Sequence, residues 1–368
     1  MEQHGMSIPL LIGGATASEM HTAVKIAPCY SHPVVYIKDA ALIPAEIEAL
    51  THENNADEHI ANHYMRQQQL RQTHAQAQPP MSIEEARKHR FIYGDDIEIA
   101  VPKHPGLHNL SIKVEQIRYL INWRAFFGVW KLDAAFAEIA NINGCDHCRA
   151  QWLAAVPQEH RNKASEAMQL YKEANRALDF LEKELTEGVT ARVALMPAGS
   201  NDENIIYRHN NVEHTLATPR QLRGEAPFLS LADYIKPIDS DEQLHDWIGA
   251  FAVTVGMKVQ ELINRKREIG DDFKALLYQS LADRLAEAAT EYTFHVVRDS
   301  LWEFSGKGIR PAIGYQSLPD QRLVFIADKV LNYNEMGITL TENGALYPTA
   351  STTGYIISHP HARYFSIL

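Results

Sequence analysis

One arginine stands in a segment whose backbone is tightly specified. Residues 308–320 read GIRPAIGYQSLPD, so Arg310 directly precedes Pro311, and Gly314 and Tyr315 follow closely. A residue before proline is restricted to extended conformations, and proline and glycine fix turns. A guanidinium on such a loop can bind a carboxylate through two hydrogen bonds. The alternative is an arginine that ties down the end of a helix, and composition leaves both interpretations open.

A second group with possible chemistry is an acidic row, Asp283, Glu287 and Glu291, spaced four residues apart in a segment with helical periodicity. This spacing places the carboxylates on one face of a helix. Such a row is usually a solvated face, and we favour that interpretation. In the alternative, one carboxylate meets a cationic group of a ligand near the middle of the helix.

Two other segments are candidates for ligand contact. The stretch GGATAS follows a short apolar run, and the helix expected after it offers free backbone N–H groups. Residues 349–365, TASTTGYIISHPHARYF, combine small hydroxyl residues with aromatic ones. Neither segment contains a nucleophile elbow or an acid–base pair. We therefore predict no catalytic residue, and expect a site that binds and positions.

The pair Cys145 and Cys148, with His147 between them, is weak support for a metal or redox site. A closed zinc site needs four ligands, and the sequence has no second pair of this kind. We therefore predict no metal site in this chain, and a zinc site at CDHC is kept only as an unfavoured alternative. With three cysteines in 368 residues, we expect a reducing, cytoplasmic setting.

The elements that would position these residues form two groups. Residues 8–12 and 33–37 read as strands around a helix at 18–26, which is a βαβ unit with too few strands for a complete parallel sheet. Residues 45–76 have a polar helical pattern. Residues 76–93 form a linker, in which Ser82 and Glu85 make a capping box.

The remainder mixes strands with long helices and has no βαβα regularity. Strands are expected at residues 191–198, 203–209 and 251–256, and a long helix at 271–304. This mixture predicts an α+β fold.

Bulk properties exclude some classes of function. The formal net charge is −11, which argues against a nucleic-acid partner. No apolar run approaches the ~20 residues of a membrane span, so no membrane association is expected.

Several segments together resemble one family. The sequence contains, in order, IPLLIGGATAS, PVVYIKDA, NWRAFFGVWKL, LADYI, DWIGAFAVTVG, LADRLAEA, GIRPAIGY and SHPHARYF. This combination resembles the C-terminal part of cobalamin-dependent methionine synthase. The resemblance implies the end of a Rossmann-like cobalamin-binding domain at 1–75, a linker at 76–95 and an activation domain at 96–368. The implied activation domain is α+β, with an antiparallel sheet and long helices.

The resemblance also implies a function. In the family, the activation domain binds S-adenosylmethionine and supports reductive methylation of inactive cob(II)alamin, while flavodoxin or a related flavoprotein supplies an electron. The implied partners are this reductant and the upstream modules of the same enzyme. Cobalamin is implied for the whole enzyme, and zinc only for upstream modules that this chain lacks. The chain alone is not expected to synthesise methionine.

The family's ligand residues can be placed on this sequence. The resemblance assigns S-adenosylmethionine binding to Asn122, Glu287, Arg310, Ala312, Gly314, Tyr315, Tyr364 and Phe365. It assigns cobalamin binding to Gly13, Gly14, Ala15, Thr16 and Ala40.

Two departures from the family pattern support a second hypothesis. Asn122 stands where the family commonly has aspartate, so a charge that would favour an ammonium group is missing. The loop reads RPAIGYQSLPDQ instead of the common RPAPGYPACPDH. The alternative function is therefore a folded regulatory or binding module with weak affinity for S-adenosylmethionine.

Overall fold

The computed structural model describes residues 5–13, 18–38, 43–51, 56–76, 80–94, 97–142, 146–239, 241 and 243–367. The chain divides into two compact units, Met1–Pro80 and Met81–Leu368. Each unit is described by itself below. The division is a property of the fold, while the assignment of 1–75, 76–95 and 96–368 to domains of a known enzyme stays a prediction.

Unit 1 is built on a parallel strand pair. Strand β1 (Leu10–Gly13) pairs with β2 (Val34–Ile37), with Leu11 opposite Val35. The connection between them is helical: α1 (Glu19–His21), the π-helical turn η2 (Thr22–Ile26) and the 3-10 turn η3 (Ala27–Cys29). The Ser18 hydroxyl caps this helix by accepting a hydrogen bond from the N–H of His21 at 3.1 Å. The predicted βαβ unit is therefore confirmed.

Two further helices complete unit 1, α2 (Ile43–Thr51) and α3 (Ala56–Gln76). The core shared by strands and helices is small: Val35, Ile37 and Leu50 are buried, and Leu11, Ile43 and Ile60 pack against them. Apolar burial of this extent provides little stabilisation, which is typical of a unit with few strands.

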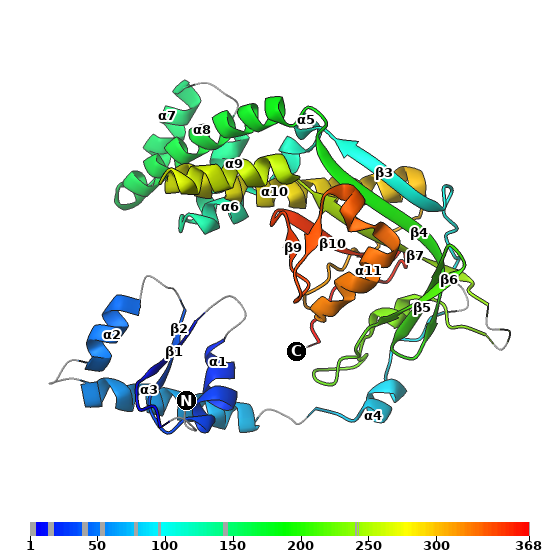
Figure 1. Ribbon diagram of the computed structural model, residues 1–368, viewed down its shortest axis with the longest axis horizontal. Coiled ribbons are helices and arrows are strands. Elements are labelled where there is room, and N and C mark those ends of the chain that lie inside the picture. The colour runs from blue at the N-terminus through cyan, green and yellow to red at the C-terminus, as the bar shows by residue number, and fades with distance from the viewer. Residues whose placement is uncertain are drawn as a thin grey trace. The chain divides into compact units, whose positions relative to one another are not determined.

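Unit 2 is a mixed α+β unit (Figure 1). Its strands are β3 (Gly106–Ile112), β4 (Val189–Asn201), β5 (Asn204–His209), β6 (Val212–Ala217), β7 (Asp246–Thr254), β8 (Thr339–Leu340), β9 (Leu346–Tyr347) and β10 (Ser351–Ile356). Its α-helices are α4 (Ile83–Lys88), α5 (Val114–Ile117), α6 (Trp123–Val129), α7 (Asp146–Ala155), α8 (Arg161–Glu184), α9 (Met257–Glu268), α10 (Asp272–Val296) and α11 (Val324–Leu331).

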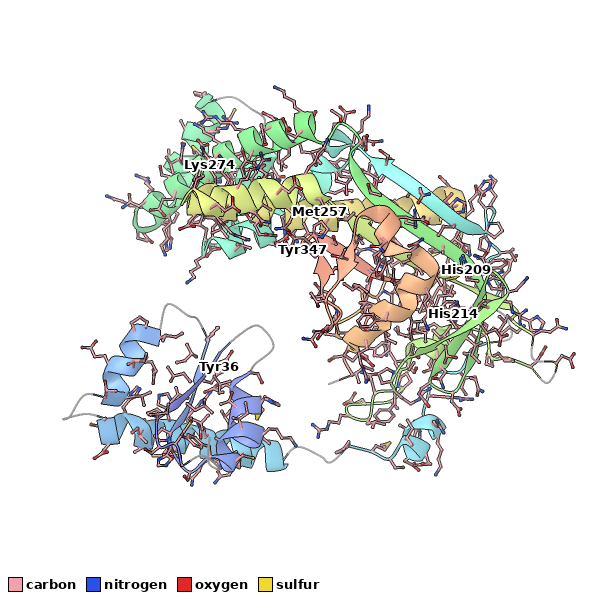
Figure 2. All side chains as sticks on the ribbon, viewed as in Figure 1. Tyr36, His209, His214, Met257, Lys274 and Tyr347 are labelled. Atoms are coloured by element: carbon pink, nitrogen blue, oxygen red, sulfur yellow. The ribbon has the colours of Figure 1, made fainter. Side chains whose placement is uncertain are left out.

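An antiparallel sheet forms the centre of unit 2. Its strand order is β10-β7-β4-β5-β6, and β3 also pairs with β4. β8 and β9 form a separate pair. The predicted strand at 191–198 lies within β4, the one at 203–209 contains β5, and the one at 251–256 overlaps the end of β7. Figure 2 labels His209 on β5 and His214 on the edge strand β6.

The sheet is covered on both faces, because side chains alternate along its central strands. On β4, Val193 and Leu195 belong to a core shared with α5, α6, α8, α9 and α10. Their neighbours Ala194 and Met196 belong to a second core, shared with α11 and with residues near the C-terminus. In Figure 1, α10 and α11 lie on opposite sides of the sheet. The predicted α+β fold is confirmed.

Helix α10 follows the sequence pattern closely. The Asp271 side chain caps it by accepting from the N–H of Lys274, and Leu277, Leu281 and Leu285 are buried on one face. A π-helical turn, η9 (Val297–Leu301), ends the predicted long helix just short of the expected residue 304.

Helix α4 lies in the predicted linker but packs on unit 2. Ser82 accepts a hydrogen bond from the N–H of Glu85, which is one half of the predicted capping box, while the Glu85 side chain pairs with Lys88. The Arg87 guanidinium pairs with Glu203 at the start of β5. Residues 83–88 are therefore structured and fixed to the sheet.

The same carboxylate takes part in a buried ion-pair network. The side chain of Arg220 is fully buried, and it donates to Glu203 at 2.7 Å and to both carboxylate oxygens of Asp233 at 2.7 Å. Asp233 also accepts from the N–H of Ser230 at 2.9 Å. The network ties the loop after β6 to the 3-10 turn η8 (Leu231–Tyr234).

Replacing Arg220 by alanine is expected to destabilise unit 2 by about 3–5 kcal/mol, because Asp233 is left as an unpaired buried charge. The matched control is Arg208→Ala, which breaks an exposed pair with Glu213 and should cost less than about 1 kcal/mol. Urea unfolding followed by tryptophan fluorescence measures both. Equal losses for the two variants would contradict this account of the network.

Candidate ligand pocket

The loop of residues 308–318 lies directly against strand β10. Ile309 and Ile357 exchange backbone hydrogen bonds at 2.9 Å, and the N–H of Ile313 donates to the carbonyl of Thr353 at 3.0 Å. The side chains of Ile309 and Ile313 are buried in the second core. The loop is thus fixed by its apolar residues and its backbone, which leaves the side chain of Arg310 free to extend toward α10.

The loop can approach β10 this closely because residue 354 on the strand is a glycine. A Cβ at this position would meet the Pro311 carbonyl and would lie 2.8 Å from the Cα of Ala312. Within the loop, Gly314 adopts φ +86° and donates its N–H to the carbonyl of Leu318 at 2.9 Å. A positive φ favours glycine, so Gly314 supports the turn that presents Tyr315.

The C-terminal segment is fastened to the same loop. The Tyr364 hydroxyl accepts a hydrogen bond from the backbone N–H of Arg310 at 2.9 Å. The Ser317 hydroxyl donates to the carbonyl of Phe365 at 2.6 Å and accepts from its N–H at 3.1 Å. These bonds bring residues of the two candidate segments, 308–320 and 349–365, together.

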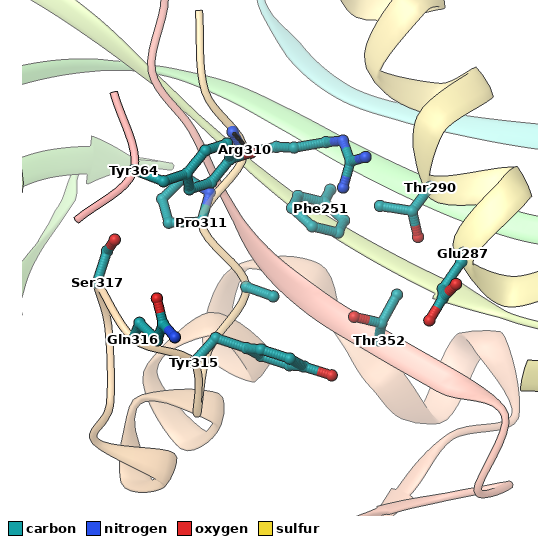
Figure 3. A pocket seen from close by; sticks show the side chains of 11 residues that line it. Phe251, Glu287, Thr290, Arg310, Pro311, Tyr315, Gln316, Ser317, Thr352 and Tyr364 are labelled. Carbon is teal, nitrogen blue, oxygen red and sulfur yellow. Dashed lines mark hydrogen bonds between the residues drawn. The ribbon is translucent and has the colours of Figure 1, made fainter. Parts of the chain in front are cut away.

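The loop, β10, β7 and α10 enclose a pocket of about 500 Å³ (Figure 3). It is lined by Phe251, Glu287, Thr290, Arg310, Pro311, Ala312, Tyr315, Gln316, Ser317, Thr352 and Tyr364. Tyr315 is 70 % and Tyr364 57 % exposed, so both rings are available to a ligand. Figure 3 shows the Arg310 side chain extending toward Thr290 on α10.

A second cavity of about 350 Å³ adjoins the first and shares Glu287, Tyr315 and Thr352 with it. It continues between α10 and β10, past Asp283 and Arg284. The two cavities together suit an elongated ligand with polar groups at its ends.

The charges of the pocket are paired, both between the loop and α10 and within α10. The Arg310 guanidinium forms an ion pair with the Glu291 carboxylate on α10. The other oxygen of Glu291 lies 3.1 Å from Nε2 of His295, one turn further along the helix. Glu287 pairs with Arg284 at 3.0 Å. Burial raises the pKa of Glu287 above its usual value, although Arg284 and Arg310 oppose this shift.

The structure brings most of the predicted ligand residues together. Glu287, Arg310, Ala312, Tyr315 and Tyr364 line the pocket. Gly314 and Phe365 do not line the pocket. Their backbones fix its loop, because Gly314 is hydrogen-bonded to Leu318 and Phe365 to Ser317.

Asn122 has a different environment. It is the N-cap of α6, and its side-chain oxygen accepts from the N–H of Ala125 at 3.1 Å. It is exposed and is not part of the pocket lining. Its predicted ligand contact stays a prediction.

The cobalamin residues are mostly beyond what the structure describes. Gly13 is the last residue of β1. Gly14, Ala15, Thr16 and Ala40 lie outside the described residues, as does Cys145 of the CDHC motif. Cys148 lies on α7. The alternative of a zinc site there therefore stays untested.

Several lining residues were not predicted. Pro311, Gln316 and Ser317 lie in the loop quoted above, and Thr352 lies in the hydroxyl-rich segment, so the sequence indicated their region but not their role. Thr290 follows Glu287 by three residues on α10 and could have been found by helical spacing. Nothing in the sequence indicated a ligand contact at Phe251, since an aromatic residue in a central strand is expected to be part of the hydrophobic core.

The pocket contains a guanidinium, carboxylates, hydroxyls and exposed aromatic rings, but no nucleophile with an adjacent base. Together with the antiparallel sheet and the helices on its two faces, this defines an α+β unit with a candidate pocket for a small polar molecule. No helix in the part of the chain that the structure describes combines the length and hydropathy needed to span a bilayer.

Comparison with known proteins identifies the family to which this chain belongs. Residues 113–368 match the family model described as "Vitamin B12 dependent methionine synthase, activation domain". The solved structure described as the MetH reactivation domain bound to AdoHcy is 28 % identical, with a TM-score of 0.66. The match covers 79 % of this chain and 90 % of that one. The chain therefore belongs to the family of vitamin B12-dependent methionine synthase activation domains, part of a methyltransferase.

The close contact at Gly354 makes a direct prediction. Gly354→Ala is expected to push the loop off β10, which should lower stability by about 1–3 kcal/mol through overpacking and increase amide hydrogen exchange at Ile309 and Ile313. Gly128→Ala is the control, because a Cβ on this glycine in α6 meets nothing within 4 Å. Unchanged exchange in Gly354→Ala would show that the loop does not depend on this contact.

Proposed function

We propose that the pocket binds S-adenosylmethionine and that the chain is the reactivation module of a cobalamin-dependent methionine synthase. The observation that carries the proposal is the convergence of Arg310, Glu287 and Tyr315 on one elongated pocket. Membership of the family and the AdoHcy bound by the similar solved structure support it.

Several parts of S-adenosylmethionine have a chemical counterpart in the pocket. Arg310 would bind the carboxylate of the methionine moiety, since its planar guanidinium matches a carboxylate. Glu287 would offset the positive charge of the ligand near the sulfonium. The exposed face of Tyr315 suits a flat adenine ring, and Thr290 and Thr352 offer hydroxyls.

Binding of the carboxylate would exchange one partner of Arg310 for another. Arg310 is paired with Glu291, so a ligand carboxylate must compete with this side chain. Glu291 keeps a partner after the exchange, because His295 already lies 3.1 Å from it. The exchange therefore leaves Glu291, whose side chain is about one-third exposed, with a hydrogen-bond partner, which limits its cost.

The proposed reaction needs positioning rather than proton transfer. This chain would hold S-adenosylmethionine with its sulfonium methyl group toward the cobalamin of the upstream modules, and S-adenosylhomocysteine would be the by-product. Cobalamin, once reduced by one electron, would supply the nucleophilic metal, and this chain would supply alignment of the methyl donor. This role agrees with a pocket that has no acid–base pair.

Two further features belong to the proposal. The electron would come from flavodoxin or a related flavoprotein, which implies a cytoplasmic setting. Unit 1 would be the end of a cobalamin-binding domain, in which Gly13 and its neighbours contact the cofactor. The glycine at the end of β1 suits close approach of a ligand to a backbone.

The alternative function, a folded module with weak affinity, is favoured by the environment of Asn122. Its side-chain oxygen is already engaged by the N–H of Ala125, and it carries no charge. If the ammonium group of S-adenosylmethionine is bound at Asn122, the affinity for this ligand will be low.

Calorimetric titration with S-adenosylmethionine tests the proposal. We expect saturable binding by the wild-type chain and a loss of at least about tenfold in Arg310→Ala, because a charged hydrogen-bonded pair contributes ~1.5–3 kcal/mol. Arg322→Ala is the matched control, since that exposed arginine pairs with Asp320 outside the pocket lining. No binding by folded wild-type chain would favour the alternative, and equal affinities of both variants would exclude Arg310.

The competition with Glu291 gives a prediction of opposite sign. Glu291→Gln is expected to tighten S-adenosylmethionine binding several-fold, because Arg310 is released from its ion pair. Asp299→Asn controls for the loss of one negative charge, since Asp299 is exposed and pairs with Arg298. The same titration measures both variants. Weaker binding in Glu291→Gln would mean that Glu291 contacts the ligand directly.

A further inference from the structure

Unit 1 contains a convergent group of metal-binding side chains that the proposed function does not use. Glu46 lies on α2, and His59 and His63 lie on α3. Oε1 of Glu46 is 2.6 Å from Nε2 of His59 and 2.9 Å from Nε2 of His63. The two Nε2 atoms are 3.1 Å apart. Among the residues that the structure describes, this is the group of histidine, cysteine and acidic side chains that could hold a metal ion.

The backbone explains why these side chains meet. His59 and His63 are four residues apart, so they lie one above the other on the same face of α3. Their rings are T-shaped, with centroids 4.7 Å apart, and both Nε2 atoms approach the same oxygen of Glu46. Helix α2 is held against α3 because Leu50 and Ile43 share the small core with Ile60.

Hydrogen bonding alone does not account well for this arrangement. If both histidines donate Nε2–H to Glu46, the two nitrogens cannot also bond to each other, yet they lie 3.1 Å apart. A cation at the centre would turn all three atoms into ligands at once. The side chains are 17–32 % exposed, so an ion can reach them from solvent.

We propose that Glu46, His59 and His63 bind a divalent transition-metal ion, with zinc as the best match. Two imidazole nitrogens and one carboxylate oxygen are a ligand set that zinc favours, and water can fill the remaining position. In a tetrahedral zinc site the ligand atoms lie roughly 3.3–3.4 Å apart, given bonds of about 2.0–2.1 Å. The observed separations of 2.6–3.1 Å need only a small expansion.

The consequence of such a site is structural. It would join α2 to α3 in a unit whose apolar core is small. A metal ion that binds only the folded form stabilises it by mass action. The inference does not depend on S-adenosylmethionine binding, because all three ligands lie in unit 1 and the pocket lies in unit 2.

The test is a titration of the chelator-treated full chain with Zn²⁺, followed by calorimetry, and with Co²⁺, followed by its visible absorption. We expect one site per chain, with the intense absorption of cobalt in a tetrahedral environment. Glu46→Gln, His59→Gln and His63→Gln should each weaken zinc binding at least about tenfold, since even partners behind the ligands contribute tenfold or more. His21→Gln, which alters an exposed histidine on α1, is the control and should leave the affinity unchanged.

Hydrogen exchange localises the effect. Zinc should slow exchange in peptides from α2 and α3 of the wild-type chain and of His21→Gln, and should have no such effect in the ligand variants. Circular dichroism without zinc shows whether each variant is folded. If a histidine variant is unfolded, Glu46→Gln still provides the test, because glutamine keeps a hydrogen-bonding side chain at this position. Absence of stoichiometric zinc, or equal affinity in wild type and Glu46→Gln, would overturn the proposal.

Discussion

The candidate site depends on one close backbone contact, between strand β10 and the loop that carries Arg310. The contact is possible because Gly354 has no side chain where the Pro311 carbonyl and Ala312 approach the strand. It uses the edge of the sheet, where β10 pairs with β7 on one side and is open on the other. The loop thus satisfies strand hydrogen-bonding groups and at the same time gains a fixed position. Arg310, Ala312 and Tyr315 are placed by this contact and not by their own packing.

The consequence is a rigid wall opposite a charged helix. Helix α10 is positioned by its buried leucine stripe, and this places Glu287 and Glu291 on the side of the helix toward the loop. The Arg310–Glu291 pair joins the two walls. A ligand that supplies both a carboxylate and a cationic centre can take over this pairing, whereas a neutral ligand would have to separate the charges without compensation.

Much of this arrangement could be predicted from the sequence, for physical reasons that differ by element. The apolar runs of β4 and β7 and the long stripe of α10 are local patterns, so the α+β fold followed from them. The turn around Gly314 was likewise predictable from residue type. The pairing of Arg310 with Glu291 was not, because the acidic row on α10 gives three equivalent candidates, and only tertiary packing selects one. Asn122 shows the same limit: the residue fits a family position, but in the structure it caps α6.

The group that we propose as a metal site in unit 1 was not indicated by the sequence, for a related reason. His59 and His63 have suitable spacing on α3, but the chain contains 18 histidines, and the third ligand comes from another helix. The spacing of His59 and His63 on α3 indicates two ligands at most. The third, Glu46, is brought next to them only by the packing of α2 on α3.

The central claim is that Arg310 recognises the carboxylate of S-adenosylmethionine. The most direct measurement compares binding of S-adenosylmethionine and decarboxylated S-adenosylmethionine to the wild-type chain and to Arg310→Ala, as a double-mutant cycle. The account predicts that removing the carboxylate weakens binding to the wild-type chain at least about tenfold and has little effect in Arg310→Ala, because the pair contributes ~1.5–3 kcal/mol. Equal losses in both proteins would show that the carboxylate is bound elsewhere and would contradict the account.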